Sequence, residues 1–329
     1  MFLSVVIPVR NGEKYIGKLL DKLIEQTYKN YEIIVVNDGS NDNTSNILKK
    51  YSSVKVYHND RSMGANFSRN LGFNKSKGEI IVFTDVDCSV ERDWLEKIVS
   101  IFMEKDVDAV AGQVFAENRD RFLARFLESS ILTPAPKYRK DIILSEDFKP
   151  RIFIATANFA VKRETLLNLN GFDPIFKHYG SDDMDFAYRL LRSGGKIYCS
   201  SKIKVYHHHR TSLLKILKRY YEYGKGFTIF KRKHPESIFS ILTTIFTSLL
   251  YIFTALIPVS LFINLGNIYL NSFIYFLASL PFLTPLLYHF YFLIKKRNPE
   301  RILYIPLDIL VIYFTAIGIL VSFIQGEGK

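Results

Sequence analysis

Short apolar runs alternate with amphipathic segments along the N-terminal part of the chain. Residues 2–8 form a nearly continuous apolar run, which is typical of a strand inside a parallel sheet. The next segment predicts a helix with one apolar face, formed by Ile16, Leu19, Leu20, Leu23 and Ile24. Further strands are predicted at 32–36, 54–57, 79–83 and 109–114, and further helices at 44–48, 63–74 and 93–103. This alternation predicts an α/β domain with a mostly parallel sheet and right-handed crossovers.

Three long apolar runs follow towards the C-terminus. Residues 238–263 contain no charged side chain. Residues 268–294 contain no charged side chain apart from His289, and residues 302–324 contain only Asp308. Each run exceeds the roughly 20 residues that a helix needs to cross a bilayer, so we expect three transmembrane helices at these positions. The alternative is a set of buried helices in a large soluble core.

The length of 329 residues and the hydrophobic content of 48% allow one good-sized α/β domain and a further region. We expect the α/β domain over residues 1–230 and the transmembrane region over residues 231–329. Residues 1–4 run straight into a strand, so we expect no cleavable signal peptide. Cys88 and Cys199 have no ligand spacing around them and are expected to be reduced thiols in a cytoplasmic domain.

The distribution of the net charge of +12 argues for a membrane partner and against nucleic acid. One basic group precedes the first apolar run: Lys215, Lys218, Arg219, Lys225, Lys231, Arg232 and Lys233. A second fills the loop after the second run: Lys295, Lys296, Arg297 and Arg301. The loop at 264–271 has no basic residue. By the positive-inside rule, we expect a cytoplasmic α/β domain, a C-terminus outside, and attraction of the basic groups to anionic lipid.

Two carboxylates one residue apart follow the strand predicted at 79–83. Residues i and i+2 of an extended segment point to the same side, so Asp85 and Asp87 can converge on one cation past the end of that strand. Open α/β sheets bind ligands at this edge. Hard oxygen ligands suit Mg²⁺ or Mn²⁺ holding a diphosphate. Taken alone, the pair is more typical of a turn capped by acids than of a metal site.

Four motifs resemble the successive signatures of one known family. They are residues 5–11 (VVIPVRN), 35–40 (VVNDGS), Gly64 with 68–72 (SRNLG), and 84–87 (TDVD). In this order they resemble family 2 glycosyltransferases, inverting enzymes with the Rossmann-like GT-A fold. The resemblance runs from about residue 2 to about residue 226 and leaves the apolar runs unexplained.

The resemblance implies roles for several residues around a nucleotide-sugar donor. Pro8 and Arg10 would line the nucleotide pocket, Asp38 would hydrogen-bond the base, Asp85 would meet the ribose, and Asp87 would hold the metal. In the family, the second motif usually begins its acidic pair with an acid; in this chain that position is Asn37. For Arg69 two interpretations stay open, an ion pair that steadies the crossover helix and a role near the diphosphate.

Residues 180–190 resemble the start of the family's catalytic helix. Its usual Glu-Asp pair is Asp182-Asp183 here, and the resemblance makes Asp183 the catalytic base. Asp182 and Asp185 are secondary candidates, and Asp185 is expected to brace or cap the helix. The simpler interpretation is that carboxylates in a first helical turn are stabilised by the helix dipole.

Three consecutive histidines follow a predicted strand that starts at Ile203. Strand alternation places His207 and His209 on one face and His208 on the other. In relatives a histidine at this point completes the metal site, so we expect His207 to be a ligand, with His209 as the second candidate. A surface cluster without a ligand is the alternative.

Two other segments have interpretations that the sequence leaves open. Residues 122–127 form an amphipathic piece that lies either on the bilayer surface or in the core. Residues 134–150 contain three prolines and many charges, which predicts a mobile loop that controls the acceptor.

The resemblance and the apolar runs together predict an inverting, Mn²⁺- or Mg²⁺-dependent glycosyltransferase. Its acceptor would be a polyprenyl or dolichyl phosphate or a lipid-linked glycan. A processive polysaccharide synthase is the first alternative, but relatives of that type carry a Gln-x-x-Arg-Trp signature, which residues 218–224 lack. A non-catalytic membrane scaffold or sugar-nucleotide sensor is the second.

Overall fold

The chain divides into two compact units. The computed structural model describes residues 1–133, 135–145, 154–176, 180–262 and 268–327. The first unit, which we call the sheet unit, comprises Met1–Glu128 and Pro134–Thr211. The second, the helical unit, comprises Ser129–Thr133 and Ser212–Lys329. The boundary expected at residue 230 therefore falls inside a helix of the helical unit.

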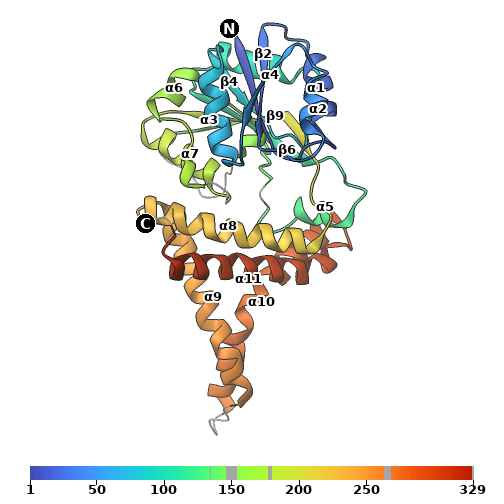
Figure 1. Cartoon of the computed structure of the whole chain (residues 1–329). Coiled ribbons are helices and arrows are strands. Elements are labelled where there is room, and N and C mark those ends of the chain that lie inside the picture. The colour runs from blue at the N-terminus through green and yellow to red at the C-terminus, as the bar shows by residue number, and fades with distance from the viewer. Residues whose placement is uncertain (134, 146–153, 177–179, 263–267, 328–329) are drawn as a thin grey trace. The chain divides into compact units, whose positions relative to one another are not determined.

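A mixed, mostly parallel nine-stranded sheet forms the centre of the described part of the sheet unit (Figure 1). Its strands are β1 (Leu3–Val9), β2 (Tyr31–Asp38), β3 (Val54–Asn59), β4 (Ile80–Phe83), β5 (Cys88–Val90), β6 (Ala109–Ala116), β7 (Ile142–Leu144), β8 (Phe159–Lys162) and β9 (Ile197–His207). Their order is β3-β2-β1-β4-β8-β6-β9-β5, and β7 also pairs with β9. The strands β3, β2, β1 and β4 are parallel, as the α/β prediction requires, whereas β8, β5 and β7 pair antiparallel with their neighbours.

Helices cover both faces of this sheet. They are α1 (Ile16–Ile24), α2 (Thr44–Leu48), α3 (Ala65–Lys75), α4 (Trp94–Glu104), α5 (Phe122–Leu127), α6 (Arg163–Asn168) and α7 (Asp182–Arg192), with short 3₁₀ turns at Thr156–Asn158 and Pro174–Phe176. Alternate residues of β1 supply the two cores: Val5 packs in the core under α1 and α4, and Val6 packs in the core under α3 and α7. The burial of both faces explains the nearly continuous apolar runs of the parallel strands.

The two segments with open interpretations both contribute regular structure to the sheet unit. Helix α5 buries Ala124, Phe126 and Leu127, which favours the core interpretation of residues 122–127. Within the predicted loop at 134–150, β7 adds a short strand to β9. Residue 134 and residues 146–150 lie outside the described part of the chain.

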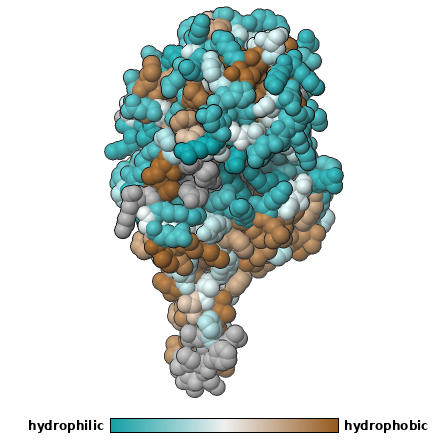
Figure 2. Space-filling view, viewed as in Figure 1, coloured by the Kyte–Doolittle hydropathy of each residue, from teal (hydrophilic) through white to brown (hydrophobic). Residues whose placement is uncertain are grey.

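The helical unit contains four long helices among its described residues: α8 (Leu213–Lys233), α9 (Ile238–Phe262), α10 (Ile268–Lys296) and α11 (Arg301–Gln325). The last three are long and apolar enough to cross a membrane, over Ile238–Pro258, Ile268–Lys296 and Arg301–Gln325. Helices α8 and α11 run side by side, whereas α9 and α10 form a hairpin that leaves this pair (Figure 1). Hydrophobic side chains gather over α11 and over the hairpin (Figure 2).

Candidate metal and nucleotide site

Strand β5 brings the second acid of the Asp-x-Asp motif to the histidines of β9. The chain turns after β4, and β5 pairs antiparallel with β9 so that Cys88 faces His207 in the register. This pairing places Nε2 of His207 3.2 Å from Oδ1 of Asp87. The backbone N–H of His208 also donates to the carbonyl oxygen of Asp87 at 2.8 Å. The expected metal residues Asp87 and His207, 120 positions apart in the sequence, are therefore neighbours in the fold.

Each member of this pair stabilises the charge of the other. Burial alone would raise the pKa of Asp87, but the charge and the hydrogen bond of His207 outweigh it and lower that pKa. Burial would lower the pKa of His207, but the Asp87 carboxylate raises it. Both side chains remain partly exposed, with 29% of Asp87 and 18% of His207 accessible. A cation can therefore displace the His207 proton and take its place beside the carboxylate.

The donor atoms at this point fit a hard divalent cation. Ligand atoms of Asp87, Cys88 and His207 all lie within 4.8 Å of one another. Burial raises the pKa of the Cys88 thiol well above its usual value, so the sulfur stays protonated and is no ligand for such an ion. One carboxylate oxygen and one imidazole nitrogen leave most of the six positions of Mg²⁺ or Mn²⁺ for phosphate oxygens and water.

The second histidine candidate, His209, lies behind His207. Its Nδ1 lies 3.2 Å from Nδ1 of His207, and the two ring centroids are 4.8 Å apart. Burial, with the neighbouring His207, lowers the pKa of His209 to about 3, so this ring is neutral and its Nδ1 can accept a hydrogen bond from Nδ1 of His207. His208 points the other way and contacts Tyr15 and Glu117, as strand alternation predicts. His209 is thus placed to orient His207.

Arg69 joins the two acidic motifs of the site. This side chain on α3 is 5% exposed. It donates from Nη2 to Oδ1 of Asp85 at 3.0 Å and from Nη1 to Oδ2 of Asp182 at 2.9 Å. Burial would lower the pKa of the guanidinium, but the two carboxylates raise it. Of the two interpretations of Arg69, the structure shows the ion pair, and this pair links the end of β4 to the start of α7.

Asn66, which belongs to none of the four sequence motifs, completes this arrangement. Its Oδ1 accepts from Nη1 of Arg69 at 3.0 Å, and its Nδ2 donates to the carbonyl oxygen of Asp173 at 3.0 Å. Asn66 is 1% exposed and lies one helical turn before Arg69. The i to i+3 spacing of the two on a helix was the only available signal.

The acids of α7 have three different environments. Asp182 pairs with Arg69. Asp185 is fully buried and pairs with Arg189 at 2.8 Å, and Arg189 also donates to the carbonyls of Leu169 and Gly171. This contact braces the helix, as expected for Asp185. Asp183 is half-buried in the first turn and accepts a hydrogen bond from the backbone N–H of Met184 at 2.9 Å.

The predicted nucleotide pocket lies at the carboxyl ends of β1 and β2. Pro8 faces Val36 in the register, and the exposed Arg10 follows β1. Both carboxylate oxygens of Asp38 accept hydrogen bonds at 2.7–2.9 Å. The donors are Asn59, the last residue of β3, and Ser62, Met63 and Gly64, which follow it. Burial would raise the pKa of Asp38, but these bonds lower it. The contact of Asp38 with a base stays a prediction, since in this conformation the carboxylate holds the 59–64 segment.

Comparison with family models assigns most of the sheet unit. Residues 4–168 match the model of glycosyl transferase family 2. Residues 143–215 match a model described as the N-terminal domain of galactosyltransferase. The first match covers half of the chain, and it contains β1 to β8 with both acids of the Asp-x-Asp motif.

Two relatives illustrate how far the similarity extends. The glycosyltransferase GlyA of Streptococcus pneumoniae is 35% identical over 127 residues, which are 38% of this chain and only 18% of that protein. A Methanococcus voltae protein is 26% identical over 330 residues, 95% of this chain and 93% of its own length. Its name is dolichyl N-acetyl-alpha-D-glucosaminyl phosphate 3-beta-D-2,3-diacetamido-2,3-dideoxy-beta-D-glucuronosyltransferase.

A solved structure shares the fold at low sequence identity. It is the mannosyltransferase PcManGT from Pyrobaculum calidifontis in complex with GDP-Man and Mn²⁺. The TM-score is 0.62 at 18% identity, and the match covers 97% of this chain and 86% of that one. This likeness supports the GT-A-like α/β architecture.

Arg69→Met tests whether the double ion pair holds β4 and α7 together. The variant leaves Asp85 and Asp182 without their shared cation, and we expect it to cost about 3 kcal/mol, or roughly 6–12 °C in apparent Tm. Arg192→Met, the same change at an exposed position of α7, should shift stability by less than about 0.5 kcal/mol. Thermal unfolding of the full chain in detergent measures both, and equal Tm values for the two variants would contradict the assignment.

Proposed function

The chain belongs to glycosyl transferase family 2, and from this premise we propose that it transfers a sugar from a nucleotide-sugar donor to an acceptor held at the membrane. The observation that carries the proposal is the pairing of Asp87 with His207 at the carboxyl end of β4. A carboxylate and an imidazole at this edge of the sheet suit a cation that binds a diphosphate.

The donor side of the reaction rests on residues from all four motifs and on His207. Asp87 and His207 would hold Mn²⁺ or Mg²⁺, which when bound offsets the charge that develops on the departing nucleoside diphosphate. Arg69 fixes Asp85 where a ribose hydroxyl can meet it. Pro8, Arg10 and the segment held by Asp38 would form the wall of the nucleotide pocket. PcManGT, with its GDP-Man and Mn²⁺, offers a precedent on the same fold.

Asp183 would act as the base on the acceptor side. Asp182 is paired with Arg69 and Asp185 with Arg189, so both have structural partners. Asp183 is half-buried in the first turn of α7, at the position to which the resemblance assigns the base. In a single displacement with inversion, the acceptor hydroxyl attacks the anomeric carbon from the face opposite the nucleotide and passes its proton to Asp183.

The acceptor would be a polyprenyl or dolichyl phosphate, or a glycan linked to such a lipid. The long apolar helices of the helical unit would anchor the enzyme where such lipids occur. The Methanococcus voltae relative, which this chain matches along nearly its whole length, has a dolichyl phosphate sugar in its name. The basic residues at 215–233 and 295–301 favour a cytoplasmic sheet unit.

Release of nucleoside diphosphate measures this function directly. The full chain should release UDP or GDP from one member of a panel of nucleotide sugars, and only when Mn²⁺ or Mg²⁺ and a lipid extract are present. If the sugar of the donor is labelled, the label should enter the organic phase. Loss of a residue that only supports a metal ligand can lower activity by roughly 100-fold. Because Asp87 would itself be a ligand, Asp87→Asn should lower activity by more than that. Asp106→Asn, the same change at an exposed acid, should keep the activity. Near-normal turnover of Asp87→Asn in chelator-treated membranes would show that the metal assignment is wrong.

Asp183→Asn separates a hydroxyl acceptor from a phosphate acceptor. A hydroxyl needs a base, so transfer to a sugar hydroxyl should slow by roughly 10²–10⁴-fold. A lipid phosphate has its second pKa near 6 and is mostly ionised at neutral pH, so transfer to it should lose less. Initial rates at saturating donor, with protein folding checked first, give the comparison. If Asp183→Asn and Asp183→Ala keep full activity with every acceptor, Asp183 is not the base.

A further inference from the structure

Helix α11 packs on α8 so closely that their backbones touch. A Cβ atom on Gly318 of α11 would lie 2.0 Å from the carbonyl oxygen of Tyr221, and one on Gly224 of α8 would lie 2.0 Å from that of Thr315. The hydroxyl of Thr228 donates to the carbonyl oxygen of Ile319 at 3.2 Å. Later residues of α8 meet later residues of α11, so the two helices run parallel. Helix α11 must therefore take the orientation that α8 takes.

Helix α8 is too highly charged to cross a bilayer. Its charged residues extend from the first turn to the last: Lys215, Lys218, Arg219, Glu222, Lys225, Lys231, Arg232 and Lys233. A bilayer core of about 30 Å would enclose nearly all of these 21 residues. Ionised side chains are costly at that depth, whereas a basic helix with an apolar face lies readily at the surface of anionic lipid.

The N-terminal half of α11 is fixed to Ser129–Thr133, a segment of the helical unit whose neighbours in the sequence on both sides belong to the sheet unit. Asp308 accepts hydrogen bonds from the hydroxyl of Ser130 and, at 3.0 Å, from the backbone N–H of Ile131. His289 of α10 contacts the same carboxylate at 2.6 Å. Both ends of the segment 129–133 lead into the sheet unit, so Asp308 lies on the side of the membrane that holds that unit.

The C-terminal end of α11 is fixed to the same side. Glu327 pairs with Lys225 at 2.5 Å, and Arg232 donates to the carbonyl oxygen of Phe323 at 3.2 Å. Residues 308 and 323 are about 22 Å apart along a helix. Both ends of this stretch thus contact groups that precede the first crossing.

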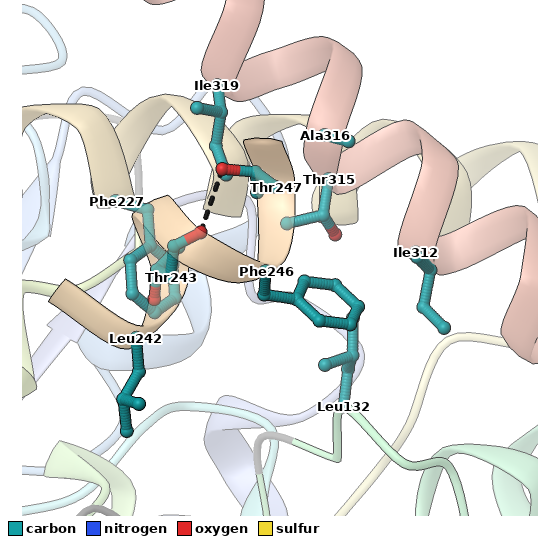
Figure 3. Close-up of a pocket in the computed structure, with 10 residues that line it drawn as sticks. All are labelled: Leu132, Phe227, Leu242, Thr243, Phe246, Thr247, Ile312, Thr315, Ala316 and Ile319. Atoms are coloured by element: carbon teal, nitrogen blue, oxygen red, sulfur yellow. Dashed lines mark hydrogen bonds between the residues drawn. The ribbon is translucent and has the colours of Figure 1, made fainter. Parts of the chain in front are cut away.

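The opposite side of α11 suits hydrocarbon. Exposed apolar side chains line it: Ile302, Leu303, Leu310, Ile317, Leu320 and Ile324. Where α9 meets α8 and α11, an apolar pocket of about 230 Å³ is lined by Phe227, Phe246 and Ile319, among others (Figure 3). Two hydroxyls in its wall bond within their own helices, Thr247 to the carbonyl oxygen of Thr243 at 2.8 Å and Thr315 to that of Val311 at 2.7 Å.

We propose that α11 does not span the membrane but lies in its cytoplasmic surface, between the charged helix α8 and the hydrocarbon. Only the α9–α10 hairpin then crosses, and the C-terminus returns to the side of the sheet unit, not outside as the apolar content of three runs suggested. The occupant of the apolar face is the lipid bilayer, and the basic residues of α8 contact its anionic headgroups. This topology also keeps the basic loop at 295–301 inside.

Single cysteines in the full chain can locate the end of α11. We would place them at three accessible positions: Ile268→Cys at the start of α10, Pro299→Cys in the loop before α11, and Gln325→Cys at the end of α11. The native Cys88 and Cys199 are buried, so labelling of the unmodified protein gives the background signal. The probe is a membrane-impermeant maleimide, added to sealed right-side-out and sealed inside-out vesicles.

The two topologies differ at Gln325→Cys alone. Ile268→Cys should label in right-side-out vesicles and Pro299→Cys in inside-out vesicles under either topology, which makes them matched controls. We expect Gln325→Cys to behave like Pro299→Cys, with at least ten times more label in inside-out vesicles than in right-side-out vesicles. Labelling of Gln325→Cys together with Ile268→Cys would overturn the proposal. Because no turnover is measured, this result is independent of the proposed transferase activity.

Discussion

The double ion pair of Arg69 is the contact on which the geometry of the site depends. A single buried guanidinium on α3 holds both Asp85, at the end of β4, and Asp182, which lies 113 residues further along the chain than Arg69 itself. Two carboxylates near each other repel, and the shared cation removes that cost. The carboxyl end of β4 and the first turn of α7 are therefore held at one distance, and this fixes the position of Asp183 relative to the Asp87–His207 pair.

A second constraint comes from the strand register. Because Cys88 faces His207, the short strand β5 places Asp87 beside the histidine that can share its cation, and His209 supports that ring from behind. The site thus combines a rigid floor of parallel strands with one antiparallel addition. A shift of one residue in this pairing would turn His207 to the other face and leave Asp87 without its partner.

The parallel half of the sheet and its acids could be predicted from the sequence because local pattern determines them. The strands β1 to β4 and the helices between them follow from apolar periodicity, and the motif at Asp85 and Asp87 ends one of those strands. The antiparallel pairings of β5, β7 and β9 could not be predicted, because they join segments far apart in the sequence. Strand β9 starts at Ile197, six residues before the expected start at Ile203. Apolar content correctly found the long helices α9, α10 and α11, but it carries no information on which neighbour a helix packs against.

The most direct test of the account is whether the metal is bound by a nitrogen of β9. Mn²⁺ bound to the full chain with a nucleoside diphosphate can be examined by pulsed electron paramagnetic resonance, which detects a directly coordinated imidazole nitrogen. We expect the nitrogen coupling in the unmodified protein and in His209→Ala, and its loss in His207→Ala. A coupling that persists in His207→Ala, or that the unmodified protein lacks, would contradict the shared site of Asp87 and His207.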